Sequence, residues 1–403
     1  MKKIIYLDNA ATTLVRKEVF EAMKKYFMAS FGNPGSITKI GVLAKKAVED
    51  SRLTIAQVLD RRPKEIIFTS SGTESNNLAI MGTVNYLSKA GVKISDMHFL
   101  TTNIEHSSVS VCFKEIESCG GQVEYLSVNS EGLIDLRDLR KKIRNNTVLV
   151  SIAYANNEIG VIQPIKEIAK EVRHARQSNT MLVDTENDSI KYPYFHTDAS
   201  QAVQYLNVNI NQLGVDFMTI DAQKIYGPKG VGALFIKSGI QVSPIIFGGG
   251  QERGFRSSTE NVPGIVGMGK ALELVEKNKK KENVRLQKFQ KYFIQKINKK
   301  ITEAFLNGGL DNRLPNNINI SIPGIDSEFV VLCLDEKGIV CSTKSACAKD
   351  ENGSVVIGAL GLGNERAISS LRFSLGIDTQ KADLDRVVSE LRNILDKINR
   401  SKI

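Results

Sequence analysis

The sequence contains no tryptophan, and it has only four histidines and five cysteines among its 403 residues. The cysteines form no Cys-x-x-Cys pair and share no zinc-like spacing with the histidines, so no structural metal site is indicated. Their odd number argues against a disulfide framework, since at least one cysteine would stay unpaired. Most of them are expected to be free and buried as small hydrophobic residues, as is usual in a reducing compartment. We therefore expect neither a metal centre nor disulfide bonds.

Long hydrophobic runs are absent as well. No stretch of about 18 consecutive apolar residues occurs, which excludes an ordinary transmembrane helix. The amino terminus reaches a carboxylate at Asp8, too early for the apolar core of a signal peptide. We expect a soluble, cytoplasmic protein without a membrane partner.

Acidic residues are in the minority, with 44 aspartates and glutamates against 54 lysines and arginines and a net charge of +10. Much of the excess lysine lies in residues 276–300. Apolar side chains recur there at near-helical spacing: Leu274, Phe289, Phe293, Ile297, Ile301 and Phe305. The lysines are most simply the solvated face of a long amphipathic helix, with a surface that docks tRNA or a partner as the alternative. We do not expect direct nucleic-acid binding.

From Glu65 onward, β-favouring segments alternate with helical segments. This alternation predicts an α/β fold with a mainly parallel sheet covered by helices on both faces. The alternation stops after Thr259, and we place a domain boundary near Val262, followed by a smaller α+β domain. The expected strands are 66–69, 98–102, 123–128, 147–153, 195–197 and 215–220 in the first part, and 317–322, 339–341 and 371–373 in the second.

Three other segments have a local interpretation. Thr12 or Thr13 is expected to cap a helix that runs through Tyr26, and residues 39–59 predict an amphipathic helix. The polar, turn-rich residues 184–194 predict a surface excursion without chemistry.

Lys224 comes after the expected strand 215–220 and before the turn residues 227–230. It therefore lies at the carboxyl end of a strand, which is where open α/β sheets bind ligands. A lysine partly removed from water there loses some preference for its charged form, and Schiff-base chemistry needs a neutral amine. Taken alone, a surface lysine beside a loop is the simpler interpretation.

Polar side chains follow four other expected strands and give Lys224 a context. They are Glu105-His106, Asn156-Asn157-Glu158, Asp198-Ala199-Ser200-Gln201 and, at the start of a helix, Ser71-Gly72-Thr73. Backbone N–H groups at a helix start can form a cup for a phosphate, although an ordinary helix cap explains the last group equally well.

Together these groups match the needs of pyridoxal phosphate. Lys224 offers the Schiff-base amine, Asp198 a carboxylate for the pyridinium proton, and His106 a flat ring to stack on the cofactor. The phosphate cup would be Ser71, Gly72 and Thr73, and the ring hydroxyl could meet Asn157 and Gln201. We predict pyridoxal phosphate as the cofactor.

The chain resembles the cysteine desulfurases of the class-V aminotransferase family over nearly its whole length. The residues that carry the resemblance are 6–13, 68–77, Glu105-His106, 156–160, 196–201, 221–230, 248–254 and 371–376. The resemblance implies the fold of type-I pyridoxal-phosphate enzymes, with a seven-stranded, mainly parallel sheet. It also implies an N-terminal arm (1–15) joining the small domain, a large cofactor-binding domain (16–261) and a small C-terminal domain (262–403) that carries a cysteine loop.

The same resemblance implies roles for further residues. A homodimer would place Thr259 at the cofactor phosphate of the opposite subunit, and Gln223 would donate a hydrogen bond to the phosphate. Arg372, backed by Asn33 and Asn157, would hold the carboxylate of the substrate L-cysteine, a task suited to a planar guanidinium.

Cys347 is the second reactive group that we expect. It lies in the polar segment 342–353, where Lys344 and Lys349 should favour the thiolate, and the family places its sulfur-accepting cysteine in this loop. Cys341 follows apolar residues and is expected in the core.

The implied reaction converts L-cysteine into L-alanine and leaves a persulfide on Cys347, with Lys224 removing the Cα proton and His106 shuttling protons. The persulfide would go to an acceptor protein such as an iron–sulfur scaffold or a tRNA-thiolating enzyme. The alternatives are a selenocysteine lyase or another β-eliminating lyase, and a cofactor-free binding partner with the same fold.

The chain departs from the family pattern just before Lys224. Many members carry Ser-Gly-His there, whereas this chain has Asp221-Ala222-Gln223. A carboxylate facing a phosphate repels it, so Asp221 is expected to turn away or to find a cation. We assign no role to Asp221. Thr38 also stands where a histidine is frequent.

Overall fold

The computed structural model describes residues 4–178, 182–184, 189–344 and 353–401. Its centre is a seven-stranded sheet in the order β2-β10-β9-β8-β5-β3-β4. β10 is antiparallel to both of its neighbours, and the other adjacent strands are parallel. The predicted α/β fold with a mainly parallel sheet is confirmed. The strands are β2 (Ile66–Thr69), β3 (His98–Thr102), β4 (Gln122–Leu126), β5 (Thr147–Ser151), β8 (Tyr194–Asp198), β9 (Phe217–Asp221) and β10 (Gly232–Ile236).

Helices cover both faces of this sheet because its strands are apolar on both sides. On one face, α3 (Gly72–Lys89) and α4 (Ser107–Ser118) enclose one buried apolar cluster. The other face is packed against a second and larger cluster. Its helices are α2 (Lys39–Val58), α5 (Leu136–Lys142), α6 (Ile165–Ser178), α7 (Ile210–Leu213) and the first half of α8 (Val262–Lys300).

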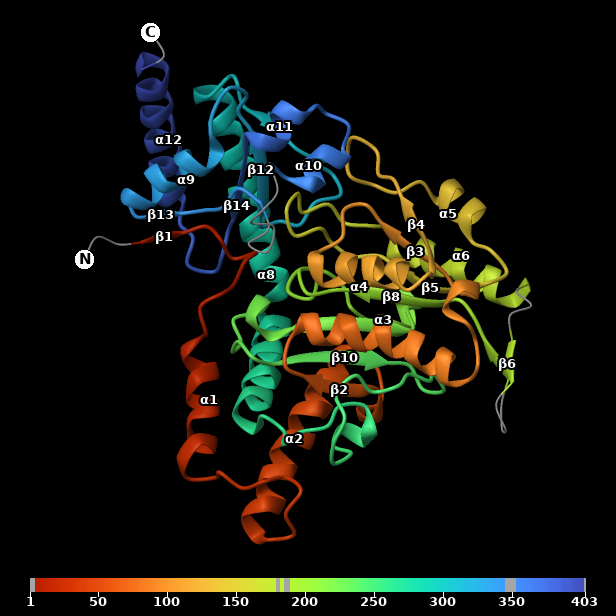
Figure 1. Ribbon diagram of the computed structural model, residues 1–403. Helices are drawn as coiled ribbons and strands as arrows, with labels where there is room; N and C mark the ends of the chain where they lie inside the picture. The colour runs from red at the N-terminus through yellow and green to blue at the C-terminus, as the bar shows by residue number, and fades with distance from the viewer. Residues whose placement is uncertain (1–3, 179–181, 185–188, 345–352, 402–403) are drawn as a thin grey trace.

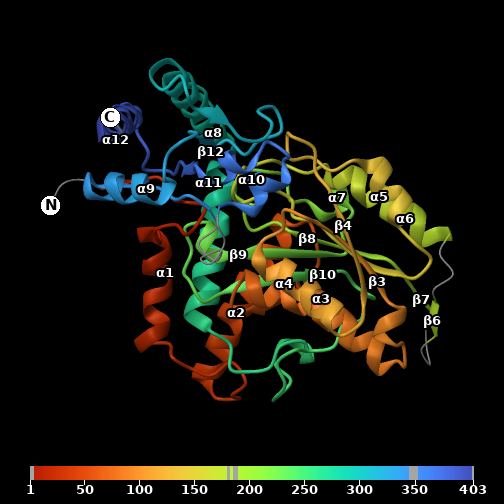
Figure 2. The same cartoon turned by 45° about the horizontal axis from the view of Figure 1, so that its top comes forward.

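As far as the structure describes it, the C-terminal part contains a small antiparallel sheet, β11-β12-β14, and four helices that follow α8. The N-terminal arm joins this part, since β1 (Ile5–Tyr6) pairs with β13 (Ile339–Val340). Figures 1 and 2 show α8 running from α1 (Lys17–Met28) and α2 into this region, so one helix connects the two parts. The remaining elements are β11 (Phe305–Leu306), β12 (Asn317–Ser321), β14 (Ser370–Ser374), α9 (Ser327–Glu336), α10 (Val355–Ala359), α11 (Asn364–Ile368) and α12 (Lys381–Ser401). The division of the chain into domains stays a prediction.

The structure corrects several local expectations. Thr13 caps no helix: its hydroxyl donates to the carbonyl of Gln223 and accepts from the amide of Tyr226, and α1 begins only at Lys17. The expected excursion at 184–194 contains a short hairpin, β6 (Leu182–Asp184) with β7 (Ser189–Lys191). Its end is not at the surface, because Tyr192 and Tyr194 are buried in the core. No strand was expected at Gly232–Ile236, where the structure has β10.

The lysine-rich helix forms as expected, with Phe293 and Ile297 of α8 buried and Lys277, Lys280 and Lys281 exposed. Phe305 lies beyond the end of the helix, in β11. In the residues that the structure describes, no helix is long and apolar enough to cross a membrane.

Candidate active site

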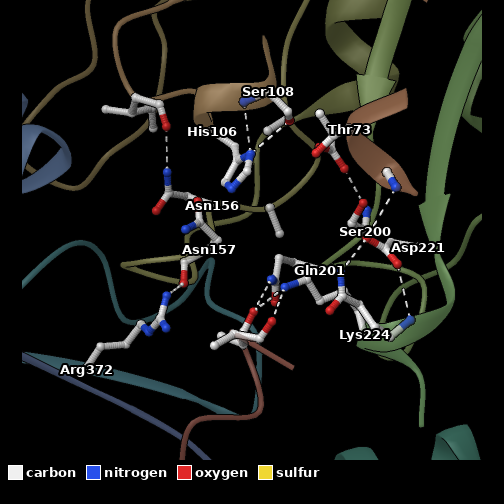
Figure 3. A pocket seen from close by; sticks show the side chains of 18 residues that line it. Thr73, His106, Ser108, Asn156, Asn157, Ser200, Gln201, Asp221, Lys224 and Arg372 are labelled. Carbon is white, nitrogen blue, oxygen red and sulfur yellow. Dashed lines mark hydrogen bonds between the residues drawn. The ribbon is translucent and has the colours of Figure 1, made fainter. Parts of the chain in front are cut away.

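The carboxyl ends of the parallel strands surround a cavity of about 270 Å³. Loops after β3, β5 and β8, the short helix after β9 and the start of α3 all contribute side chains to it (Figure 3). Of the residues singled out in the sequence, it is lined by Gly72, Thr73, His106, Asn157, Asp198, Gln201, Gln223, Lys224 and Arg372. All of these except Arg372, which comes from β14 (Ser370–Ser374), are brought together because parallel strands end at a common edge of the sheet.

Lys224 ends a single helical turn, Ala222–Lys224, directly after β9. Its Nζ donates hydrogen bonds to the carbonyl oxygens of Ala10 (2.8 Å) and Ala11 (2.5 Å), which belong to the N-terminal arm. Burial lowers the pKa of Lys224 below its usual value, and the nearby carboxylate of Asp221 partly opposes this. The amine is therefore enclosed and easier to neutralise than a surface lysine.

Asp198 and His106 are linked through two buried side chains. The Asp198 carboxylate accepts hydrogen bonds from Asn76 Nδ2 (2.8 Å) and from the backbone amide of Ser200 (2.9 Å). Asn76 Nδ2 also donates to Ser108 Oγ (2.8 Å), which lies 2.8 Å from His106 Nδ1. Burial lowers the pKa of His106, while the charge of Asp198 acts in the opposite direction. The imidazole is thus held in place and predisposed to be neutral.

The start of α3 forms the other side of the cavity. Ser71 is the N-cap of this helix, with its hydroxyl accepting from the amide of Glu74 (3.2 Å), and it is not among the lining residues. Gly72 and Thr73 do line the cavity, next to Gln223. The ordinary cap therefore accounts for Ser71, whereas Gly72 and Thr73 line the cavity at the start of the helix.

Asp221 behaves differently from the expectation. Its carboxylate does not turn away but lines the cavity, where Oδ2 accepts from the Gly72 amide (3.2 Å) and from Gln223 Nε2 (3.1 Å). Among the described residues, no lysine or arginine is paired with Asp221. The hydrogen bonds to Gly72 and Gln223 hold the carboxylate in place, and its charge acts on the nearby Lys224 without a direct ion pair.

Arg372 enters the cavity from β14, and Figure 3 shows it on the side opposite Thr73 and Asp221. The side chain is 1% exposed; Nη2 donates to Asp8 Oδ1 (2.8 Å) and Nη1 to the carbonyl oxygen of Asn157 (3.0 Å). Its buried Nε has no hydrogen-bond partner among the described residues. A guanidinium with an unused donor is well suited to bind a carboxylate.

Two residues singled out in the sequence lie away from this cavity. Asn33 is exposed in the loop before α2, where its Oδ1 accepts from the Gly35 amide, and Thr259 is exposed beyond the short helical turn Glu252–Gly254. Neither lines this cavity within a single chain. Cys347 lies outside the described residues.

Residues 5–387 match the model of the aminotransferase class-V family. A protein from Dictyoglomus turgidum named cysteine desulfurase IscS is 44% identical over 99% of this chain and 96% of its own length. This chain belongs to the cysteine desulfurase family. Another desulfurase, cysteine desulfurase IscS 1 of Archaeoglobus fulgidus, is 40% identical over 98% of this chain and 97% of its own length.

Solved structures of desulfurase-like proteins agree with the fold. A structure titled NifS-like protein has a TM-score of 0.88 at 32% identity and covers 98% of this chain and 100% of its own. A second, titled SspA in complex with cysteine, has a TM-score of 0.76 at 32% identity over 92% and 98% of the two chains. Members of the desulfurase family are pyridoxal-phosphate enzymes.

The cavity of this desulfurase-family chain suits pyridoxal phosphate, because it contains the enclosed amine of Lys224, the carboxylate of Asp198 and the imidazole of His106.

Several residues in and around the cavity were not assigned a role from the sequence. Ser108, Asn156 and Ser200 line it, and Asn76 and Asp8 bond to lining residues. Ser200 and Asn156 lie in the polar segments that follow expected strands, so the same pattern could have predicted them. Nothing local marked Asp8 as a partner of Arg372, 364 residues away.

Proposed function

We propose that the chain is a cysteine desulfurase that uses pyridoxal phosphate to take sulfur from L-cysteine. The proposal depends above all on one observation, the enclosed amine of Lys224 in the same cavity as the carboxylate of Asp198 and the guanidinium of Arg372. The relatives at 40–44% identity, which carry the name cysteine desulfurase, support the activity.

Different residues of the cavity would hold the different parts of the cofactor. Lys224 is the amine that would attach its aldehyde, and Asp198 would pair with its ring nitrogen, with His106 against the ring face. Asn157 and Gln201 would meet the ring hydroxyl, and the Gly72–Thr73 amides with Gln223 would meet the phosphate, beside the helix cap Ser71. When bound, pyridoxal phosphate supplies an aldehyde that condenses with amines and a ring that accepts the electrons of a broken Cα–H bond.

The substrate carboxylate would bind at Arg372. The Nε donor of Arg372 has no hydrogen-bond partner among the described residues, and Asp8 holds Nη2 in position. Lys224, once released from the cofactor, is an amine in reach of the cavity and can move the Cα proton. The carbonyl oxygens of Ala10 and Ala11 provide a place for its ammonium form.

Cys347 would receive the sulfur. Its thiolate would attack the sulfur of the substrate and form the S–S bond of a persulfide while the Cβ–S bond breaks. The electron pair of that bond would stay on Cβ, which takes up a proton to give alanine. His106, whose pKa is lowered by burial, can carry a proton at Nε2 during this exchange. The persulfide would then pass to an acceptor protein, for which an iron–sulfur scaffold and a tRNA-thiolating enzyme are the candidates.

A substrate comparison tests this function. Purified protein with pyridoxal phosphate should form alanine and sulfide from L-cysteine in equal amounts when a thiol reductant is present. Cysteamine, which has no carboxylate for Arg372, should react at least about 100-fold more slowly, because a site built to bind a polar group rejects analogues that lack it. Pyruvate and ammonia as products would instead indicate a β-eliminating lyase. Turnover of L-selenocysteine with no detectable turnover of L-cysteine would indicate a selenocysteine lyase.

We further propose a homodimer. Large apolar side chains are exposed on and around α1, including Phe27 (62%) and Phe31 (68%), and such a patch needs a partner surface. Thr259 lies outside the cavity of its own chain, so a second chain could bring its copy to the phosphate.

The dimer can be tested by changing the apolar patch. Light scattering should give twice the mass of the chain for the wild type, and the double variant Phe27→Asp, Phe31→Asp should be monomeric because burial of two charges is costly. Phe329→Asp, on the exposed side of α9, is the matched control and should remain a dimer. A monomeric wild type at micromolar concentration would contradict the proposal.

A further inference from the structure

Asp221 occupies the place in the cavity where the cofactor phosphate is expected. The residue ends β9 and is 6% exposed. Its carboxylate accepts hydrogen bonds from the backbone amides of Gly72 and Gln223, at 3.2 Å each, and from Gln223 Nε2 at 3.1 Å. The Gly72 amide and Gln223 are also the donors proposed for the phosphate. The Asp221 carboxylate therefore already accepts the hydrogen bonds that the cofactor phosphate would need.

The groups around Asp221 do not neutralise it. The cations that line the cavity are Lys224, which donates to Ala10 and Ala11, and Arg372, which is bound to Asp8 on the opposite side. His106 and Asp198 face the same space from α4 and β8. In the first turn of α3, Glu74 is already paired with Arg256 (2.9 Å). A phosphate dianion beside Asp221 would thus meet a second negative charge, offset by the helix start of α3 and by Lys224 while that amine is charged.

Moving the carboxylate away would be unfavourable. Asp221 would give up its hydrogen bonds to Gly72 and Gln223, which together involve both of its carboxylate oxygens. A single proton removes the conflict instead. A phosphate monoester has its second pKa near about 6, so its monoanion is accessible near neutral pH. One proton between carboxylate and phosphate makes a charge-assisted O–H···O bond, which is stronger than a neutral one.

We propose that Asp221 makes this site take the cofactor phosphate together with one proton, held between the phosphate and the Asp221 carboxylate. Cofactor retention then falls as pH rises through the range in which free phosphate is a dianion. This inference rests on the proposed use of pyridoxal phosphate and adds a proton-coupled step to its binding.

Binding of two related aldehydes isolates the phosphate. Apo protein of the full chain is titrated with pyridoxal phosphate and with pyridoxal, which lacks the phosphate, and binding is followed by the near-visible absorption band. The ratio of the two dissociation constants cancels the ionisation of Lys224, which both ligands share. In the wild type, the advantage of the phosphate should shrink by up to about tenfold per pH unit between about pH 7 and pH 8.5, as expected for uptake of one proton above the phosphate pKa.

The variant Asp221→Asn keeps the shape of the side chain but removes its charge. For this variant the ratio should be nearly independent of pH and, at about pH 8, should favour the phosphate at least tenfold more than in the wild type. Asp221→Ser should change the ratio in the same direction, and circular dichroism shows whether each variant folds. If neither variant folds, the pH dependence of the wild type decides.

Two results would overturn the inference: a wild-type ratio that does not change with pH, or a ratio in Asp221→Asn that favours the phosphate less than the wild type does. Failure of pyridoxal phosphate to produce any absorption band would contradict the proposed function instead, so the two can be distinguished.

Discussion

Lys224→Ala should lower desulfurase activity by at least about 1,000-fold, because it removes both the amine that attaches the cofactor and the base that moves the Cα proton. The protein should also fail to develop the absorption band that the wild type acquires with pyridoxal phosphate and loses on borohydride treatment. The structure explains why no neighbouring side chain can substitute. Among the described residues that line the cavity, Lys224 and Arg372 are the lysine and arginine present, and a guanidinium is not a usable nucleophile at neutral pH.

Lys229→Ala is the matched control for this prediction. Lys229 lies five residues further on, is exposed, and does not line the active-site cavity. This variant should keep the band and the activity of the wild type. A Lys224→Ala protein that still formed a borohydride-sensitive band with pyridoxal phosphate would show that a different lysine attaches the cofactor.

Cys347→Ser should lower the release of sulfide from L-cysteine by at least about 100-fold in the presence of a reductant, because a serine hydroxyl cannot form a persulfide. The cofactor band and its response to L-cysteine should remain, since Lys224, Asp198 and Arg372 are unchanged. Mass spectrometry should find an added sulfur on Cys347 of the wild type and none on the variant.

The exposed Cys119 provides the comparison for this experiment. Cys119→Ser should behave as the wild type, which excludes a general effect of removing a thiol. Cys341 is less useful as a control, because it is buried and its burial raises the pKa of the thiol to about 12. Sulfide release from Cys347→Ser at the rate of the wild type would exclude Cys347 as the acceptor and favour direct elimination.

The central sheet was predictable because its strands are short apolar runs separated by helices, a pattern that a parallel sheet requires. β10 was not among the expected strands. A short apolar run also does not reveal the direction of a strand, so its antiparallel pairing with β2 and β9 could not be predicted. Tyr192 and Tyr194 were placed at the surface because their neighbours are polar, yet aromatic rings bury large apolar areas and here reach the core.

Lys224, Asp198, His106 and Asn157 could be placed near the ends of strands from their positions in the chain, because the strands of a parallel sheet end at one common edge. The contacts of these groups depend on how the distant segments pack. The carbonyl oxygens that bind Lys224 come from the N-terminal arm, and the partner of Arg372 is Asp8. The structure also placed the carboxylate of Asp221 at the start of α3, where the sequence predicted that it would turn away or find a cation. The physical reason is that hydrogen-bond partners distant in the chain follow from packing, which local patterns of residues do not specify.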